Sequence, residues 1–344
     1  MKKIVVIGGG TGTFTVLSGL KKYPDVDLTA IVSMADSGGS NRVLRDDFGL
    51  LPTSDLRQCL VALAGNNGDN LMWRKLFSYR YNKGVGISGM TFGNLFMAAL
   101  ADILGSQDKA IDKTAEILNV KGKVIPVSFD DVQLLATYSN GNQVVGEHFI
   151  DEPKEGHNGK LRIKKLSTIP KAKANEKALE AIKKADMIIL GPGDLYTSIL
   201  ANVVIDGIAD AVCSSKAKVI YVVNLMTKWG QTFKMGVKAH IEEMEKYLLD
   251  QKSKIKNQTS NQKHQNNIDY IIINSEKITD DILNKYKTEY AQQVADDLTG
   301  DLGYRIIRAD LVPNGVVKKT AGDMVKRSLI RHDATKLAKV IMGI

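Results

Sequence analysis

Cysteine is scarce in this chain, since Cys59 and Cys213 are the only two among 344 residues. Two cysteines cannot build a disulfide framework, and no cysteine and histidine spacing matches a zinc site. Both lie in apolar, helix-forming surroundings, so we expect buried thiols and a reducing, cytoplasmic location. Long apolar runs are also missing. Because a membrane helix needs about 20 apolar residues, we expect no integral membrane segment, and the strand-like run at residues 4–7 leaves no room for a signal peptide.

Signatures of several enzyme classes are absent as well. No GxxxxGK[ST] loop occurs, which argues against a P-loop NTPase. None of the five histidines belongs to a serine or cysteine nucleophile motif. An NAD-dependent dehydrogenase is a weak alternative, because no base with an orienting partner is recognisable. We therefore assign no catalytic residue from the sequence.

The net charge of +9 at pH 7 does not by itself indicate a nucleic-acid-binding protein. The lysines are spread along the chain, and no known motif interleaves aromatic residues with arginines. Diffuse lysine is typical of a solvated surface. We expect no nucleic-acid partner, whereas small anionic ligands agree with this charge.

Strand-like and helix-like segments alternate along most of the chain. This order predicts a Rossmann-like α/β fold with three α/β/α layers, a mainly parallel sheet and one domain over residues 1–344. Residues 123–168 alternate polar and apolar side chains, and Asn140-Gly141 marks a hairpin, so a small antiparallel strand region is expected there, with strands over residues 124–127, 132–138, 144–150 and 161–165. Residues 250–267 have almost no apolar side chains and are interpreted as an exposed, mobile polar insertion. The buried strands expected in the parallel sheet are residues 4–7, 28–33, 187–190, 219–223, 270–273 and 304–307.

A run of glycines follows the first predicted strand and precedes a segment with helical apolar spacing. Glycines let the backbone approach an anion closely, and a helix N-terminus offers free N–H groups with a partial positive charge. The pattern predicts a phosphate-binding turn. A tight strand–helix connection without a ligand is the alternative, because Thr13 replaces the third glycine of GxGxxG. The run consists of Gly8, Gly9, Gly10, Thr11 and Gly12.

The loop after the second predicted strand is a further candidate for ligand binding. Asp36 lies where Rossmann proteins place a ribose-binding acid, about 20 residues after the glycines. Gly38, Gly39 and Ser40 follow it and favour a second anion-binding turn, and Arg45 lies nearby. A polar surface turn is the alternative.

Residues 51–60 lead into the next predicted helix. Asp55 there is a candidate ligand contact, and an ordinary helix N-cap is the equally plain alternative. Arg57 in the first turn opposes the helix dipole, which favours a pairing or ligand role.

Residues 191–198 repeat the design of the first loop: strand, glycines, hydroxyl groups and helix. Gly191 and Gly193 flank a proline, and Tyr196, Thr197 and Ser198 follow. Two phosphate-binding loops on one sheet suit a ligand with a diphosphate or two anionic ends. A Gly-Pro turn without a ligand is the alternative.

Together these stretches resemble the YvcK/CofD-like family over nearly the whole chain and in consistent order. Each motif alone is weak, but the set is specific. The similar stretches are residues 8–12, 36–45 (D-D-G-G-S-x-G-x-L-R), 51–60 (L-P-P-G-D-x-R-x-C-L), 93–95 (the end of G-H-x-x-G-N-L), 191–199 (G-P-G-S-L-Y-T-S-I), 224–227 (N-x-M-T) and 331–333 (R-H-D).

The resemblance implies a Rossmann-like core and two activities. The YvcK branch comprises bacterial cytoplasmic proteins that bind nucleotide-sugars such as UDP-N-acetylglucosamine and are linked to gluconeogenic growth, cell-wall synthesis and cell shape. The CofD branch transfers a phospholactyl group from a guanosine diphosphate carrier to the deazaflavin Fo with Mg²⁺. Residues 51–60 and 224–227 look more like YvcK, so we expect a regulatory protein that binds a nucleotide-sugar or dinucleotide. A phospholactyl transferase is the alternative, and a homodimer stays open.

The expected ligand site combines the four loops with the motif residues implied by the resemblance. Backbone N–H groups of the two glycine runs would hold phosphates, and Asp36 would accept a hydrogen bond from a sugar hydroxyl. Arg45, Arg57 and Arg331 are the candidate charge partners. The full set is Gly8, Gly9, Gly10, Thr11, Gly12, Asp36, Gly38, Gly39, Ser40, Arg45, Asp55, Arg57, Asn94, Gly191, Gly193, Tyr196, Thr197, Ser198, Asn224, Thr227 and Arg331.

Five positions depart from the family pattern. Ser37 replaces the second acid of D-D, Ser54 a glycine, Met90 a histidine, Asp194 a serine and Ala201 a proline. The loss of an acid and an imidazole argues against catalysis more than against the fold. A metal site is left unassigned, and Mg²⁺ belongs only to the transferase alternative.

Overall fold

A parallel sheet forms the centre of the molecule. The computed structural model describes residues 1–65, 69–255, 266–300, 302–313 and 329–344. In these residues the sheet has the order β10-β9-β8-β7-β1-β2-β3, and every neighbouring pair is parallel. Its strands are β1 (Lys2–Gly8), β2 (Val26–Val32), β3 (Lys123–Pro126), β7 (Met187–Leu190), β8 (Lys218–Val222), β9 (Tyr270–Asn274) and β10 (Arg305–Ala309).

Each face of the sheet is covered by helices, because side chains of a buried strand point alternately to two apolar cores. In β1, Ile4 and Val6 belong to the core beneath α1 (Gly10–Leu20), α3 (Ser54–Leu63), α6 (Gln107–Ile117) and α13 (Ala334–Met342). Val5 and Ile7 belong to the opposite core, with α8 (Glu176–Lys183), α9 (Ala201–Val203), α10 (Ile208–Ser214) and α11 (Val237–Ile255). The predicted three-layer α/β/α fold is confirmed. The remaining α-helices include α2 (Gly39–Phe48), α4 (Asp69–Ser78), α5 (Phe92–Leu104) and α12 (Asp280–Lys287).

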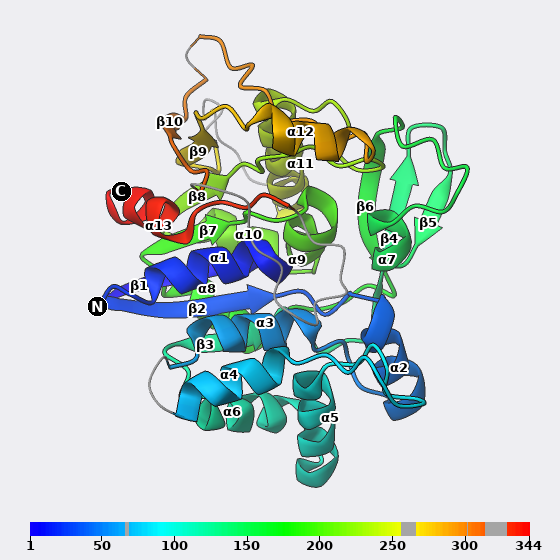
Figure 1. Cartoon of the computed structure of the whole chain (residues 1–344). Coiled ribbons are helices and arrows are strands. Elements are labelled where there is room, and N and C mark those ends of the chain that lie inside the picture. The colour runs from blue at the N-terminus through cyan, green and yellow to red at the C-terminus, as the bar shows by residue number, and fades with distance from the viewer. Residues whose placement is uncertain (66–68, 256–265, 301, 314–328) are drawn as a thin grey trace.

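A small antiparallel sheet lies beyond the carboxyl ends of the parallel strands, beside α7 (Glu147–Asp151), while the N-terminus lies at the opposite end (Figure 1). Its order is β5 (Gln143–Val145), β4 (Gln133–Tyr138) and β6 (Ile163–Ile169). The hairpin at Asn140-Gly141 is confirmed, with Gly141 at a φ of +86°. The strand predicted to reach residue 150 is wrong, because Gly146 at a φ of +99° turns the chain into α7.

The order of the strands fixes where a ligand would bind. From β1 the chain builds the sheet outward to β2 and β3, and then returns to place β7 on the other side of β1. At such a switch point the loops leave neighbouring strands in opposite directions and open a crevice at the carboxyl ends. The strand order therefore predicts a ligand crevice between the ends of β1 and β7, where the two glycine runs follow.

Several local predictions can be compared with the structure. Asn175 caps α8 by accepting a hydrogen bond from the Lys177 N–H at 3.0 Å, and Asp333 caps α13. Residues 55–80, whose leucine spacing is helical, form two helices, α3 and α4. Cys59 is buried, as predicted, but Cys213 is only half-buried and its thiol donates to the Leu248 carbonyl at 3.4 Å; the two cysteines do not form a disulfide. Among the helices described, none combines the length and apolar character needed to cross a bilayer.

The polar segment at residues 250–267 is described only at its ends. Helix α11 continues to Ile255, and residues 256–265 lie outside the described residues. At the other end Asn267 is buried, and its backbone and side-chain N–H groups donate to Glu245 at 3.0 and 2.8 Å. A mobile insertion therefore stays a prediction for this segment. Asn267, which is buried and bonded to Glu245, does not belong to it.

Candidate functional site

The two glycine runs meet at the crevice. We call residues 8–12 the first glycine loop and residues 191–194 the second glycine loop. A Cβ at Gly12 would lie 2.0 Å from the carbonyl oxygen of Pro192, far inside van der Waals contact. A Cβ at Gly193 would lie 3.7 Å from the carbonyl oxygen of Gly9. The absence of a side chain at Gly12 thus lets the two backbones touch.

The first glycine loop ends in the N-terminus of α1. Gly9 precedes the helix without any side-chain cap, and Gly10 begins it at a φ of +60°. The first turn of a helix has N–H groups without intrahelical partners, which is why anions bind there. The Gly10 N–H donates to the carboxylate of Asp55. In the described structure, an acid of the chain itself therefore lies where an anion is expected.

Asp55 comes from the first turn of α3, but it does not cap that helix. The N-cap of α3 is Thr53, and its side chain makes no capping hydrogen bond. Asp55 lies instead against the first glycine loop, where a Cβ at Gly9 would be 2.2 Å from its Oδ2. Burial and the neighbouring charge of Asp36 raise the pKa of Asp55 to about 7, against the opposing effects of the Gly10 N–H and Arg57.

The second glycine loop is fixed from two sides. The Gly193 N–H donates to Oδ1 of Asn224 at 3.0 Å, which brings the residue predicted from the N-x-M-T motif to the crevice. A π-helix, η1 (Leu195–Leu200), follows; such helices are frequent at functional sites. The fully buried Asn202 side chain donates to the carbonyls of Gly8 at 3.2 Å and Ser198 at 2.7 Å, so it ties the first glycine loop to η1.

Lys228 neutralises the acid in the second glycine loop. Its Nζ lies 2.7 Å from Oδ2 of Asp194 and also pairs with Asp151 of α7. Burial lowers the pKa of Lys228, but the charges of Asp194 and Asp151 outweigh burial and raise it above its ordinary value. Thr197 and Gln231 donate to Asp151 as well, at 3.2 and 3.1 Å. Lys228 therefore compensates the negative charge that Asp194 would otherwise present to a phosphate.

A relay of hydrogen bonds leads from the interior to Asp36. The Arg57 Nε donates to Asn94 Oδ1 at 2.9 Å, and Asn94 Nδ2 donates to Ser54 Oγ at 3.1 Å. Ser54 Oγ donates to Asn41 Oδ1 at 3.0 Å, and the Asn41 amide donates to Asp36. The Gly38 N–H donates to the other oxygen of Asp36 at 2.9 Å. These bonds hold the Asp36 carboxylate in one orientation at the start of α2.

Burial raises the pKa of Asp36, although its bonds from Gly38 and Asn41 oppose that shift. Glu147 of α7 lies near the same acids; burial and the charges of Asp36, Asp151 and Asp55 raise its pKa well above the ordinary value. Five acidic side chains thus lie near the glycine loops, and Lys228 pairs with two of them, Asp151 and Asp194. The predicted site missed Glu147, Asp151 and Lys228. The single available sequence signal was that Lys228 follows the 224–227 motif directly.

Several predicted site residues are hydrogen-bonded or paired to other parts of the chain. Buried Arg57 donates to Asn94 and to the Phe77 carbonyl, Arg45 pairs with Asp131 at 3.2 Å, and the Tyr196 hydroxyl donates to the Ile163 carbonyl at 3.4 Å. Thr227 accepts a hydrogen bond from the Gln292 N–H at 3.0 Å. Each of these four residues has a partner within the chain, and its role as a ligand contact stays a prediction. Gly39 and Ser40 begin α2, and Arg331 directly precedes the segment that leads into α13; their ligand roles stay predictions.

Most of the side chains that depart from the family pattern make specific contacts in the structure. Ser37 Oγ accepts the His148 N–H at 3.1 Å, which joins α7 to the Asp36 loop. Ser54 is a link of the relay, and Asp194 pairs with Lys228. Met90 is buried in a small apolar cluster with Leu44 and Ala98. Four of the five replacements are therefore accommodated by specific contacts.

The donor set does not fit a resident metal ion. Across the described part of the chain, no three aspartate, glutamate, histidine or cysteine side chains converge in a way that could hold one. Asp194 and Asp151 bond to Lys228, and Asp36 and Asp55 bond to Gly38 and Gly10. We therefore derive no step through a metal.

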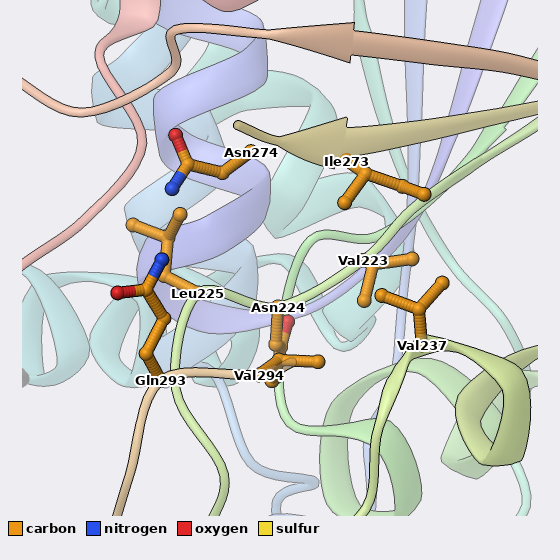
Figure 2. Close-up of a pocket in the computed structure, with 8 residues that line it drawn as sticks. All are labelled: Val223, Asn224, Leu225, Val237, Ile273, Asn274, Gln293 and Val294. Atoms are coloured by element: carbon orange, nitrogen blue, oxygen red, sulfur yellow. The ribbon is translucent and has the colours of Figure 1, made fainter. Parts of the chain in front are cut away.

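Two cavities lie outside the crevice. The first, of about 10 Å³, lies beside Asn224 and is lined mainly by aliphatic side chains such as Val223, Ile273 and Val294 (Figure 2). It has room for about one water molecule. The second, of about 730 Å³, lies along β3 between α6 and α8, near Lys3 and Asp27 at the amino ends of β1 and β2. Neither lies where the glycine loops meet.

Comparison with known proteins agrees with this arrangement. A family model described as 2-phospho-L-lactate transferase CofD matches residues 4–312. A "Putative gluconeogenesis factor" of Thermoanaerobacterium thermosulfurigenes is 39% identical over 99% of this chain and 96% of its own length. The "Gluconeogenesis factor" of Bacillus subtilis (strain 168) is 34% identical over 99% of this chain and 98% of its own length.

A solved structure shows the same fold. The X-ray structure of a Bacillus halodurans protein has 33% identity and a TM-score of 0.84, with 99% of each chain covered. Similarity therefore extends over both the parallel sheet and the smaller antiparallel sheet. The chain belongs to the YvcK/CofD family.

Proposed function

We propose that this protein binds a nucleotide-sugar of the UDP-N-acetylglucosamine class in the crevice between β1 and β7, and acts in the cytoplasm as a regulator of gluconeogenic growth, cell-wall synthesis and cell shape. The names of its relatives support a role in gluconeogenesis. The crevice supports a ligand with two phosphates, because two glycine loops from neighbouring strands face each other there.

The observation that carries the proposal is the contact between Gly12 and the Pro192 carbonyl. The contact supports the proposal because it brings the two glycine loops together at the carboxyl ends of β1 and β7, although in the second loop the Gly191 N–H donates to the Ile7 carbonyl and the Gly193 N–H to Asn224. Asp36, held by Gly38 and Asn41, supplies an acceptor for a ribose or sugar hydroxyl at the edge of the same crevice. Lys228 compensates the acid of the second glycine loop, so that loop carries no unpaired negative charge toward a phosphate.

A calorimetric panel tests the proposal. UDP-N-acetylglucosamine, NAD, GDP and Fo are titrated into the full chain under identical conditions. Saturable binding of the UDP-sugar without binding of Fo is the expected result. Tight binding of NAD or of Fo, without the UDP-sugar, would contradict the proposal.

The second candidate function is phospholactyl transfer to Fo, which the match to the CofD family model favours. The side chains at the crevice argue against phospholactyl transfer, since Asp194 pairs with Lys228 and Met90 lies in an apolar cluster. We expect no robust product when Fo, the guanosine-diphosphate-linked donor and Mg²⁺ are supplied and product mass is followed. Turnover of about 1 per second or more, lost in both Asp36→Asn and Asp194→Asn, would establish the transferase instead.

A further inference from the structure

The first glycine loop is already bonded to an anion of the chain itself. Asp55 accepts the Gly10 N–H, and its Oδ2 lies so near Gly9 that a Cβ there would be 2.2 Å away. A phosphate at the same helix N-terminus would lie close to this carboxylate. A phosphate and the Asp55 carboxylate this close together repel each other strongly, because partial burial reduces the screening by water.

We infer that Asp55 is a resident anion of the first glycine loop, and that a diphosphate ligand binds there together with a proton taken up by Asp55. This inference rests on the proposed function. The proton comes from solvent and converts the carboxylate to a carboxylic acid, and no other bond is made or broken. The neutral acid then donates a hydrogen bond where the carboxylate would repel.

The groups around Asp55 explain why a proton, and not a neighbouring cation, supplies the compensation. Asp36 faces it from the loop after β2, and Glu147 and Asp151 face it from α7. On its own helix it is near Arg57 and Cys59. Arg57 is directed to Asn94 and Phe77, and Lys228 pairs with Asp151 and Asp194. The first turn of α1 contributes no charged side chain.

The titration of Asp55 falls in the range where such a proton can be exchanged. Its pKa is raised to about 7, first by burial and then by Asp36. A phosphate beside it raises the pKa further, so ligand binding draws a proton from solvent at neutral pH. The ligand itself does not titrate there, because the diphosphate diester of a nucleotide-sugar lacks the second phosphate ionisation near about pH 6.

Calorimetry of UDP-N-acetylglucosamine binding at about pH 6, 7 and 8, each in two buffers of different ionisation enthalpy, measures both affinity and proton uptake. For the wild-type chain we expect uptake of up to one proton at neutral pH. Affinity should weaken by up to about tenfold between pH 7 and pH 8. Asp55→Asn should bind without proton uptake and more tightly than wild type at pH 8. The matched control is Asp102→Asn, an exposed acid on α5, which should behave like wild type.

The outcomes separate this inference from the proposed function. Binding by the wild-type chain without proton uptake or pH dependence overturns the inference alone. So does loss of binding in a folded Asp55→Asn variant, since the carboxylate would then contact the ligand directly. A repeat with Mg²⁺ that abolishes the pH dependence would assign the compensation to the cation. Absence of UDP-N-acetylglucosamine binding at every pH contradicts the proposed function and the inference together. If Asp55→Asn does not fold, Asp55→Ser and the proton uptake of the wild-type chain still decide.

Discussion

The two glycine loops have the same design in the sequence but different surroundings in the structure. The first glycine loop enters a regular α-helix, and its Gly10 N–H bonds to a carboxylate that titrates near neutral pH. The second glycine loop enters a π-helix, its Gly193 N–H bonds to a neutral amide, and its acid pairs with Lys228. The comparison teaches that a glycine-rich turn indicates where an anion can come close to the backbone. The side chains packed against it from distant elements decide the charge that an anion meets.

The largest expected effect on stability comes from pushing the two loops apart. Gly12→Ala places a Cβ 2.0 Å from the Pro192 carbonyl, so backbone must move. We expect a loss of about 2 kcal/mol or more in the free energy of unfolding, and a drop of at least about tenfold in UDP-N-acetylglucosamine affinity.

The control is Gly86→Ala, where no atom lies within 4 Å and only a φ of +85° is strained. Urea unfolding and calorimetry of both variants make the measurement. A Gly12→Ala variant as stable and as tight-binding as Gly86→Ala would show that the loops do not touch.

The next largest loss of stability is expected when the positive charge beside the second glycine loop is removed. Lys228→Met leaves Asp151 and Asp194 without their cation, in side chains that are about one-quarter to one-third exposed. We expect a loss of about 2 kcal/mol in unfolding free energy at neutral pH, less than for a fully buried pair. Asp194→Ser in the same chain should recover part of it.

The pH dependence checks this prediction. Because Lys228 helps hold the pKa of Asp151 below its ordinary value, the ion pair stabilises the fold above the unfolded pKa near about 4. The stabilisation is lost as pH falls through the folded pKa. The difference in unfolding free energy between wild type and Lys228→Met should therefore become smaller as the pH is lowered. A gap that stays constant down to about pH 3 would contradict the ion-pair account.

Breaking the relay to Asp36 should have a smaller effect. Ser54→Ala removes the hydroxyl that links Asn94 to Asn41, and Asp36 loses its fixed orientation. We expect UDP-N-acetylglucosamine to bind about three- to tenfold more weakly, which corresponds to about 1 kcal/mol. In a double-mutant cycle, Ser54→Ala should have almost no further effect on an Asp36→Asn background. Full additivity would show that Ser54 does not act through Asp36.

The smallest effect is expected from shortening the polar segment at residues 256–265. Replacing residues 256–265 with a short Gly/Ser linker, while keeping Asn267 and its bonds to Glu245, should leave ligand affinity unchanged. A change in loop length contributes about 0.6 kcal/mol per doubling. Unfolding and binding curves that match wild type are expected. A variant that fails to fold would show that this segment packs on the domain.

These comparisons also show what the sequence could predict. The parallel strands and both glycine loops were predictable, because β-branched runs and glycine turns are local patterns. The relay from Arg57 to Asp36 was not, since its bonds join residues as far as 40 apart in sequence, as between Asn94 and Ser54. Lys228 and Asp151 meet across 77 residues, and the segment around Asp151 was predicted as a strand. Partners that only the tertiary fold brings together leave no periodic signal.

The most direct test of the central claim is the affinity of Gly10→Val for UDP-N-acetylglucosamine, measured by calorimetry with the melting temperature of the free variant as a control. Valine at a φ of +60° is strained, and its branched side chain would block the approach to the first turn of α1. We predict a folded protein whose affinity falls at least about 100-fold, which corresponds to about 2.7 kcal/mol. Unchanged affinity in a well-folded Gly10→Val variant would contradict the assignment of the first glycine loop as the phosphate-binding turn.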